Sequence, residues 1–285
     1  MTRYTENEFL RIGVKERGAE LTSVYAKDAG YEFLWQGDPA VWSGQSPMLF
    51  PIVGRLLDDV YRLDGKTYSL PKHGFARKSD WAFLGETKEG LRFRLSESEE
   101  TLKSYPYAFD LTADFSLRGR SLTVTHTVRN KNGGDMYFSF GAHPGFNCEI
   151  GDKLVFSEDE TLATERIDLE RSLRLPETVP VLNGEREIVI TKDIFNEDAL
   201  ILHGFRSSHI TLFAHGGKQT VRFALNGAPY LGIWAKPGAP YVCIEPWWGV
   251  NDDGRARSDL SQKDGIRRLS SGETFTCAWT ADFSY

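Results

Sequence analysis

Short runs in which apolar and polar residues alternate recur along almost the whole chain, with turn residues between them. The clearest run is residues 121–129, where Leu122, Val124, His126 and Val128 share one face and threonines occupy the other. Period two is typical of a half-buried β-strand, because successive side chains point to opposite faces of a sheet. Many such runs with almost no helical periodicity predict an all-β fold, a large antiparallel β-sandwich.

Glycine-containing turns at the ends of these runs predict hairpins. Asp64-Gly65 lies between two strand-like runs, and Gly119 separates two alternating runs. Three further pairs predict hairpin turns in the second half of the chain: Gly216-Gly217, Asn226-Gly227 and Pro237-Gly238. Residues 158–171 are less regular, and we expect a short helical turn there.

Composition limits the class of protein. The 285 residues show no internal repeat and no shift of composition, so we expect one domain, residues 1–285. Three cysteines without a C-x-x-C spacing indicate a reducing compartment. The N-terminus has no apolar signal segment and no run approaches eighteen apolar residues, which predicts a cytoplasmic protein without a membrane partner. A net charge of −6 without a basic block argues against nucleic acid as the partner.

A strand that ends in G-A-H-P-G is the most informative candidate site. Phe138 and Phe140 are in phase, and His143 follows, with Pro144 and Gly145 directly after it. Proline ends sheet pairing and glycine permits a sharp turn, so the imidazole would be held rigidly at the end of a strand. The alternative is a structural histidine whose nitrogens are satisfied by hydrogen bonds.

A glutamate at the end of an apolar strand is the second candidate. Alternation places Tyr241, Cys243 and Glu245 on one face, and Pro-Trp-Trp follows the glutamate. Burial among aromatic rings raises the pKa of a carboxyl group, as a general base working near neutrality requires. The flat face of Trp247 also suits the apolar face of a sugar. The alternative is a glutamate paired with an arginine.

Positive charge surrounds another histidine. His73 lies in P-K-H-G-F-A-R, where Gly74 allows close backbone approach and Lys72 and Arg77 bring positive charge. Arg55 ends the apolar run L-F-P-I-V-G-R. Its planar fork can neutralise a carboxylate or bind hydroxyl groups, and structural pairing is the alternative.

Several kinds of site have no support in the sequence. No H-x-H or H-E-x-x-H spacing occurs, so we expect no dedicated metal site. The nucleophile motif G-x-S-x-G and the G-x-x-x-x-G-K-[ST] phosphate loop are also missing. We expect His126, in phase on an apolar strand face, to be a structural histidine of the sheet.

Four motifs resemble those of the aldose 1-epimerase (galactose mutarotase-like) family. They are L-F-P-I-V-G-R-L, K-H-G-F-A-R, G-A-H-P-G-F-N and C-I-E-P-W-W-G, in this order. The nearest branch is a sparsely characterised bacterial one, and the resemblance runs from about Gly18 to Phe283. It implies a β-supersandwich with an open cleft for a hexose, acting as a monomer or homodimer without metal or cofactor.

The resemblance also implies roles for individual residues. Glu245 would be the catalytic base and His143 the catalytic acid, while His73 and Arg55 would position the substrate. Asp198, in F-N-E-D-A-L-I-L, is the best match to the family's aspartate that binds sugar hydroxyls.

Two departures leave the substrate open. The galactose-active members have H-x-Y-F-N where this chain has H-P-G-F-N, and H-G-F-A-R resembles the hexose-6-phosphate members, in which an arginine here helps to hold the phosphate. The sequence therefore favours a hexose mutarotase, and the alternative is a hexose-6-phosphate 1-epimerase that uses Arg55, Lys72 and Arg77 as an anion clamp. A carbohydrate-binding or sensing protein without catalysis is the third possibility, which needs no acid and base together.

Overall fold

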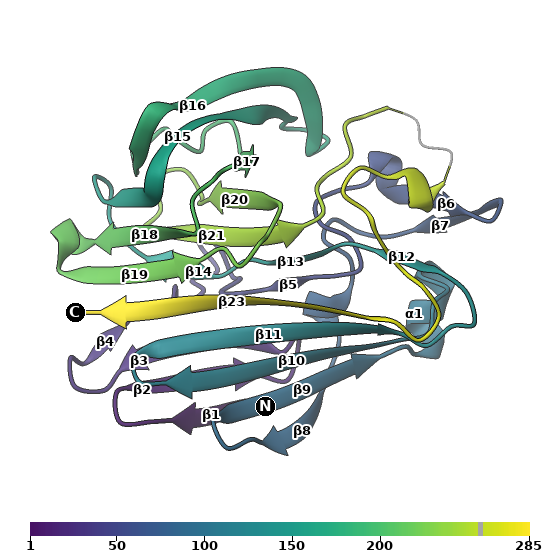
Figure 1. The fold of residues 1–285 in the computed structure, drawn as a ribbon, viewed down its shortest axis with the longest axis horizontal. Helices are drawn as coiled ribbons and strands as arrows, with labels where there is room; N and C mark the ends of the chain where they lie inside the picture. The colour runs from purple at the N-terminus through teal and green to yellow at the C-terminus, as the bar shows by residue number, and fades with distance from the viewer. Residues whose placement is uncertain (256–258) are drawn as a thin grey trace.

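The structure of this chain is a computed structural model that describes residues 1–255 and 259–285. Its elements are almost all β-strands, and every pair of neighbouring strands is antiparallel (Figure 1). The prediction of an all-β antiparallel fold is therefore confirmed. The one α-helix in this part of the chain, α1 (Glu99–Ser104), is a short capped turn, and no described helix is long and apolar enough to cross a membrane.

The largest sheet has nine strands and forms one layer of the sandwich. Its order is β16 (Leu173–Val189), β15 (Lys153–Asp168), β18 (His209–Ala214), β19 (Gln219–Ala224), β23 (Thr274–Ser284), β11 (Ser121–Asn130), β10 (Phe109–Arg118), β9 (Gly90–Ser96) and β8 (Ala82–Glu86). In Figure 1, β23, β11, β10 and β9 lie side by side, and the β15–β16 hairpin stands above them.

A second sheet of six strands carries the candidate site. Its order is β17 (Leu200–His203), β20 (Tyr230–Trp234), β21 (Tyr241–Trp248), β13 (Phe140–Ala142) and β5 (Met48–Leu49), and β14 (Gly145–Asn147) also pairs with β21. All eight residues of β21 are buried. It is also paired along both edges, with β20 on one side and β13 and β14 on the other.

Three smaller sheets complete the fold. One contains β1 (Thr2–Glu6), β2 (Leu10–Lys15), β3 (Glu20–Ala26) and β4 (Tyr31–Glu32); the others are the hairpin β6 (Val60–Leu63) with β7 (Lys66–Ser69), and β12 (Met136–Phe138) with β22 (Arg267–Leu269).

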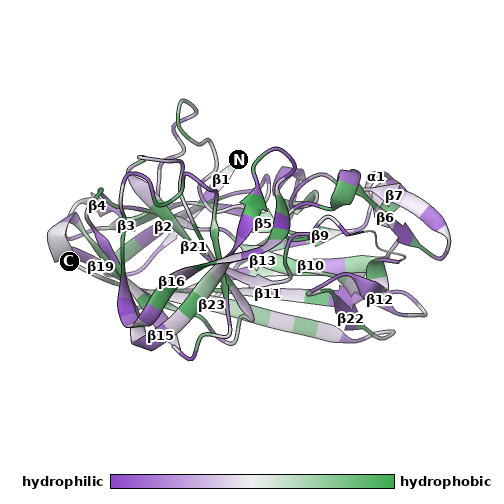
Figure 2. Ribbon diagram, turned by 90° about the horizontal axis from the view of Figure 1, so that it is seen from above, coloured by the Kyte–Doolittle hydropathy of each residue, from purple (hydrophilic) through white to green (hydrophobic). Residues whose placement is uncertain are grey.

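The core lies between the two large sheets. Residues along β10 and β11 alternate between buried and partly exposed, as the period-two pattern predicts, and Figure 2 shows a similar alternation of hydropathy along β23. His126, 2% exposed, lies in this core with its ring centroid 4.6 Å from that of Phe140. On the same interface the ring centroids of Phe146 and Phe223 lie 6.1 Å apart. His126 is thus a buried histidine of the sheet, as predicted.

Most of the predicted hairpin turns are confirmed. Asp64 and Gly65 both have positive φ, 49° and 76°, as a two-residue turn between antiparallel strands requires, and they join β6 to β7. The turns at Gly119, at residues 216–217 and at residues 237–238 also join paired strands. The prediction of a hairpin at Asn226-Gly227 is wrong, because this turn carries the chain from β19 in the nine-stranded sheet to β20 in the six-stranded sheet.

The short helical turn predicted within residues 158–171 is wrong. Residues up to Asp168 belong to β15, which pairs with β16 along most of its length. The pairing register shifts at four places, yet the buried residues from Leu154 to Thr164 stay in one phase, and the phase changes only before Ile167. Two of the buried positions carry polar residues, Glu160 and Thr164, which hid the period-two pattern from the sequence.

A glycine in the nine-stranded sheet offers a test of its packing. A Cβ atom at Gly90 would lie 1.8 Å from the carbonyl oxygen of Phe115, whereas one at Gly133 would meet no atom within 4 Å. We expect Gly90→Ala to lower the free energy of unfolding by about 1–3 kcal/mol or more, because the neighbouring strand must move. Urea denaturation measures this, with Gly133→Ala as the matched control. Equal stability of the two variants would contradict the strand register.

Candidate active site

Glu245 lies inside the fully buried strand β21 and not at its end, where the sequence predicted it, because pairing continues through Pro246 to Trp248. It lies on β21 opposite Gly232 of β20, and its side chain is 1% exposed. The predicted face of β21 is also observed, because Cys243 and Glu245 lie beside His143, while the Tyr241 ring stacks on the Trp42 ring at 5.2 Å. The carboxylate is therefore presented to one side of the sheet among aromatic groups.

His143 lies opposite Glu245 because its strand is interrupted. β13 pairs with Trp247 and Trp248 of β21, and β14 pairs with residues 241–243, so the intervening His143 and Pro144 face the segment that contains Glu245. Pro144 interrupts the ladder there, as expected, although its carbonyl still accepts a hydrogen bond from the Ile244 N–H. Nε2 of His143 lies 3.2 Å from Oε1 of Glu245.

The two groups are strongly perturbed by burial. Burial raises the pKa of Glu245 well above its usual range, an effect that the Trp247 indole N–H opposes and the negative charge of Asp198 reinforces. The indole N–H donates to Oε2 of Glu245 at 3.2 Å. Burial lowers the pKa of His143 to about 3, with smaller contributions from Arg77 and Lys72. Both groups are thus pushed towards their neutral forms.

His73 is fixed by the backbone around Gly54. The Gly54 N–H donates to Nδ1 of His73 at 3.1 Å, so the proton of the neutral ring is assigned to Nε2. Burial, Lys72, His143 and Arg77 lower the pKa of His73 well below its usual range. Its ring centroid lies 6.1 Å from that of His143. A neutral imidazole with a free Nε2–H can donate a hydrogen bond to a ligand.

The expected close approach at Gly74 is also present. Its φ is +68°, and a Cβ atom there would lie 2.3 Å from the carbonyl oxygen of Phe50. His73 itself has a φ of +67°. Only glycine fits the second position, and this packing fixes the loop that carries the histidine.

These side chains line one cavity of about 280 Å³, a size at the lower end for small-molecule sites. Of the residues predicted from the sequence it contains Lys72, His73, Arg77, His143, Asp198, Glu245 and Trp247. The structure therefore brings all of them except Arg55 together from distant parts of the chain. Their place in the lining does not by itself assign a role to any of these residues.

The cavity has charged groups of both signs. Lys72 and Arg77 line it together with Asp198. One terminal nitrogen of Arg77 donates to the carbonyl of Lys72 at 2.9 Å, and its Nε is buried without a hydrogen-bond partner among the described residues. Asp198 has a φ of +72°, and its side chain accepts a hydrogen bond from the Ala199 N–H.

Arg55 is not brought to this cavity. Its guanidinium makes two hydrogen bonds to the carboxylate of Asp59, at 2.8 Å and 2.6 Å, four residues along the chain. Gly54 turns the chain here with a φ of +73°, and the side chain of Arg55 follows the loop towards Asp59. The structure therefore shows the pairing with a carboxylate that was the alternative for Arg55, and a role in positioning a substrate stays a prediction.

Among the aromatic and polar residues that line the cavity, Trp42, Trp234 and Asn251 were not singled out from the sequence. The Trp42 ring lies 5.1 Å from the His143 ring at a tilt of 31°, and Trp234 meets the same imidazole edge-on at 5.7 Å. Asn251, 5% exposed, also lines the cavity. Alternation in Y-L-G-I-W could have placed Trp234 two positions beyond the glycine that faces Glu245. Trp42 and Asn251 lie in loops and gave no signal.

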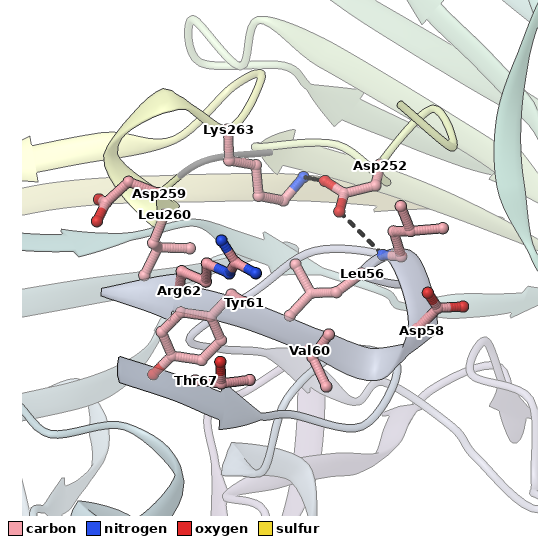
Figure 3. Close-up of a pocket in the computed structure, with 11 residues that line it drawn as sticks. Leu56, Asp58, Val60, Tyr61, Arg62, Thr67, Asp252, Asp259, Leu260 and Lys263 are labelled. Carbon is pink, nitrogen blue, oxygen red and sulfur yellow. Dashed lines mark hydrogen bonds and ion pairs between the residues drawn. The ribbon is translucent and has the colours of Figure 1, made fainter. Parts of the chain in front are cut away.

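A second cavity, of about 290 Å³, lies beside the β6–β7 hairpin (Figure 3). The described residues that line it include no histidine. Its buried charges serve the fold: Lys263 pairs with Asp252 at 3.0 Å, and the carboxylate also accepts the Leu57 N–H. This cavity lacks the acid and base that meet in the first one.

Comparison with known proteins agrees with this geometry. The family model described as "Aldose 1-epimerase" matches residues 3–253. The chain belongs to the aldose 1-epimerase family. The curated LacX protein of Lactococcus lactis subsp. lactis, in its chromosomal form, is 31% identical over 284 residues, with 94% of this chain and 95% of the relative covered. The family predicted from four motifs is thus confirmed.

Solved structures show the same epimerase fold. A "galactose mutarotase related enzyme" from Lactobacillus acidophilus superposes with a TM-score of 0.94 at 32% identity, covering 100% of this chain and 98% of the other. A galactose mutarotase-like protein from Lactobacillus casei gives 0.93 at 28%, covering 100% of both chains. The galactose 1-epimerase of Lactobacillus acidophilus, at 17% identity and a TM-score of 0.72, shares the fold, with 99% and 94% covered.

The electrostatics of this site can be tested by NMR. We expect the imidazole signals of His73 and His143 not to titrate between pH 8 and pH 5, because both pKa values are lowered and the neutral rings persist to lower pH. Signals are assigned by their loss in His73→Gln and His143→Gln. In the urea-unfolded protein the same rings should titrate near about 6.5. A midpoint near that value in the folded protein would contradict the buried environment.

Proposed function

We propose that this protein is an aldose 1-epimerase, a mutarotase that interconverts the α and β anomers of a hexose. The observation that carries the proposal is the 3.2 Å contact between His143 and Glu245 on a sugar-sized cavity. Mutarotation needs a base at the C1 hydroxyl and an acid at the ring oxygen, and both oxygens are bonded to C1. An acid and a base so close together suit two atoms that are neighbours in the substrate.

The proposed reaction moves one proton at each of these oxygens. Glu245 removes the proton of the C1 hydroxyl, the electrons of that bond form the aldehyde, and the C1–O5 bond breaks. The ring oxygen takes its proton from His143. Rotation about the C1–C2 bond presents the other face of the aldehyde, and the reverse transfers close the ring.

Burial of the pair favours ring opening. The reactive form is an imidazolium beside a carboxylate, and ring opening converts it into a neutral imidazole and a carboxylic acid. Burial lowers the pKa of His143 and raises that of Glu245, so the low-dielectric site favours this redistribution and, for the same reason, disfavours the charged pair from which it starts. Sugar hydroxyls that replace lost water would stabilise the charged form at the start of the step.

Other lining groups would hold the sugar. The Nε2–H of His73 is available to donate to a hydroxyl, and the carboxylate of Asp198 is available to accept from one. Trp42, Trp234 and Trp247 offer aromatic surface to the apolar face of a pyranose. The family itself implies a small-molecule sugar as the ligand.

A second candidate is a hexose-6-phosphate 1-epimerase. The observation that favours it is that Lys72 and Arg77 line the same cavity as the acid and the base, and that Nε of Arg77 has no partner among the described residues. A guanidinium makes strong charge-assisted hydrogen bonds to phosphate. Arg55 drops out of this anion clamp, since it pairs with Asp59.

The role of the carboxylate is tested by Glu245→Gln. We expect sugar binding to persist and the enzyme-dependent rate of polarimetric equilibration of fresh α-glucose to fall by about 10²–10⁴-fold, the usual contribution of a general base. Glu177→Gln, an exposed glutamate on β16, is the matched control and should keep the full rate. A near-normal rate in Glu245→Gln removes this residue from catalysis, and saturable binding by a wild-type protein without turnover indicates a sugar-binding protein instead.

The choice of substrate is tested by Arg77→Ala. If phosphate is bound here, the substitution should lower kcat/KM for glucose 6-phosphate by about 10–100-fold and that for glucose much less, since a hydrogen bond to a charged group contributes about 1.5–3 kcal/mol. Arg55→Ala removes an equal charge away from the cavity and should change neither value. Equal effects of Arg77→Ala on both sugars would remove the phosphate candidate.

A further inference from the structure

We propose that His143, Cys243 and Glu245 form a zinc-binding site at the floor of the cavity, and that Zn²⁺ bound there inhibits the enzyme. One ligand atom from each of the three residues lies within 4.8 Å of the others, and all three side chains are buried. The residues come from β21 and from the connection between β13 and β14. No short sequence motif could therefore reveal the cluster.

The distances suit a tetrahedral ion. Zinc bonds of about 2.0–2.1 Å to nitrogen and oxygen place those two ligands about 3.3 Å apart at the tetrahedral angle. His143 and Glu245 are already 3.2 Å apart. No two of the ligand atoms are more than 4.8 Å apart, so reaching the spacing required around zinc takes a movement of about 1 Å at most. Gly145 lies beside the thiol, where a Cβ atom would come within 3.3 Å of Sγ, so a larger residue would crowd the ligand.

The charges also balance. A thiolate and a carboxylate neutralise a divalent ion, and the imidazole binds in its neutral form, so the buried cluster would carry no net charge. Because burial favours the protonated forms of both Cys243 and Glu245, the thiol and the carboxylic acid each release a proton to solvent when the metal binds. A thiolate and an imidazole select borderline or soft ions such as Zn²⁺ over Mg²⁺ and Ca²⁺, which prefer oxygen ligands.

The ion would be reached from the cavity. His143 and Glu245 both line it, whereas Cys243 lies behind them at 0% exposure. The three ligands leave the fourth position of a tetrahedral ion towards the cavity, open to water or a sugar hydroxyl. Coordination occupies the lone pair of Nε2 and the carboxylate oxygen, the atoms that the proposed reaction uses to move protons. Inhibition rests on the proposed function, whereas metal binding does not.

Binding is tested with Co²⁺ as a spectroscopic probe of the full chain. We expect one equivalent of Co²⁺ to give a thiolate-to-cobalt charge-transfer band in the near ultraviolet, and Zn²⁺ to displace it. Cys243→Ser should lose the band. Its affinity for Zn²⁺ should fall by more than about 10–100-fold, which is the usual loss when a residue that only hydrogen-bonds to a ligand is replaced. Cys277→Ser, another buried free cysteine, should keep both. A wild-type protein without the band, or a Cys243→Ser variant that retains it, overturns the site.

Inhibition is tested separately by polarimetry. We expect Zn²⁺, but not Mg²⁺, to slow mutarotation by the wild-type protein and by Cys277→Ser, and EDTA to restore the rate. Cys243→Ser should equilibrate the sugar at the wild-type rate without metal and resist Zn²⁺, with Cys243→Ala as a second variant if the serine impairs folding. Equal inhibition of the wild type and the Cys243 variants overturns the proposal. A cobalt band in a protein without mutarotase activity would uphold the site and reject the proposed function alone.

Discussion

The candidate site depends on a buried contact between an imidazole and a carboxylate. His143 and Glu245 are 3.2 Å apart, with side chains 11% and 1% exposed. Removal of both groups from water is unfavourable, and their attraction alone does not compensate reliably for it. The sheet holds them instead, because β13 and β14 both pair with β21 and leave the histidine opposite the glutamate. Backbone hydrogen bonds thus enforce a pair that would not assemble by itself.

The groups around this pair favour and oppose the charged forms of the two side chains at the same time. The Trp247 N–H and the charge of Lys72 favour the carboxylate, whereas burial and Asp198 disfavour it. Burial and the positive charges of Arg77 and Lys72 keep the imidazole neutral. Burial outweighs the groups that favour the charged forms, and ionisable groups so strongly perturbed in a cleft often mark a functional site.

Sequence patterns predicted the elements of this fold better than their arrangement. Alternation identified β10 and β11, and the G-A-H-P-G stretch correctly predicted a histidine at an interrupted strand, because these signals are local. Buried polar residues, Glu160 and Thr164, concealed the period-two pattern of β15. The partner of Arg55 and the approach of Trp42 to His143 depend on loop conformations, which no local periodicity encodes.

The two sides of the cavity are built by different forces. On the sheet side, Trp247 packs in a small apolar cluster with Leu49, Val53 and Ile201, separate from the main core. On the other side, polar bonds hold the loop after β21 against the β15–β16 hairpin. Arg174 donates to the carbonyl of Asn251 at 2.8 Å, and the Asn251 amide donates to the carbonyl of Ser172 at 2.8 Å.

This division has a consequence for substrate choice. The ring oxygen and the C1 hydroxyl are common to all aldopyranoses, so a rigid sheet that carries His143 and Glu245 suits the invariant part of the reaction. Sugars differ at their other hydroxyls and at C6, and those atoms would meet the groups outside the sheet, among them Lys72, Arg77 on a short 3₁₀ turn, and Asp198. Such connecting segments can change these groups without disturbing the strand that carries Glu245. In the proposed reaction, selection among sugars would therefore fall to the connecting segments, and the proton transfers to the sheet.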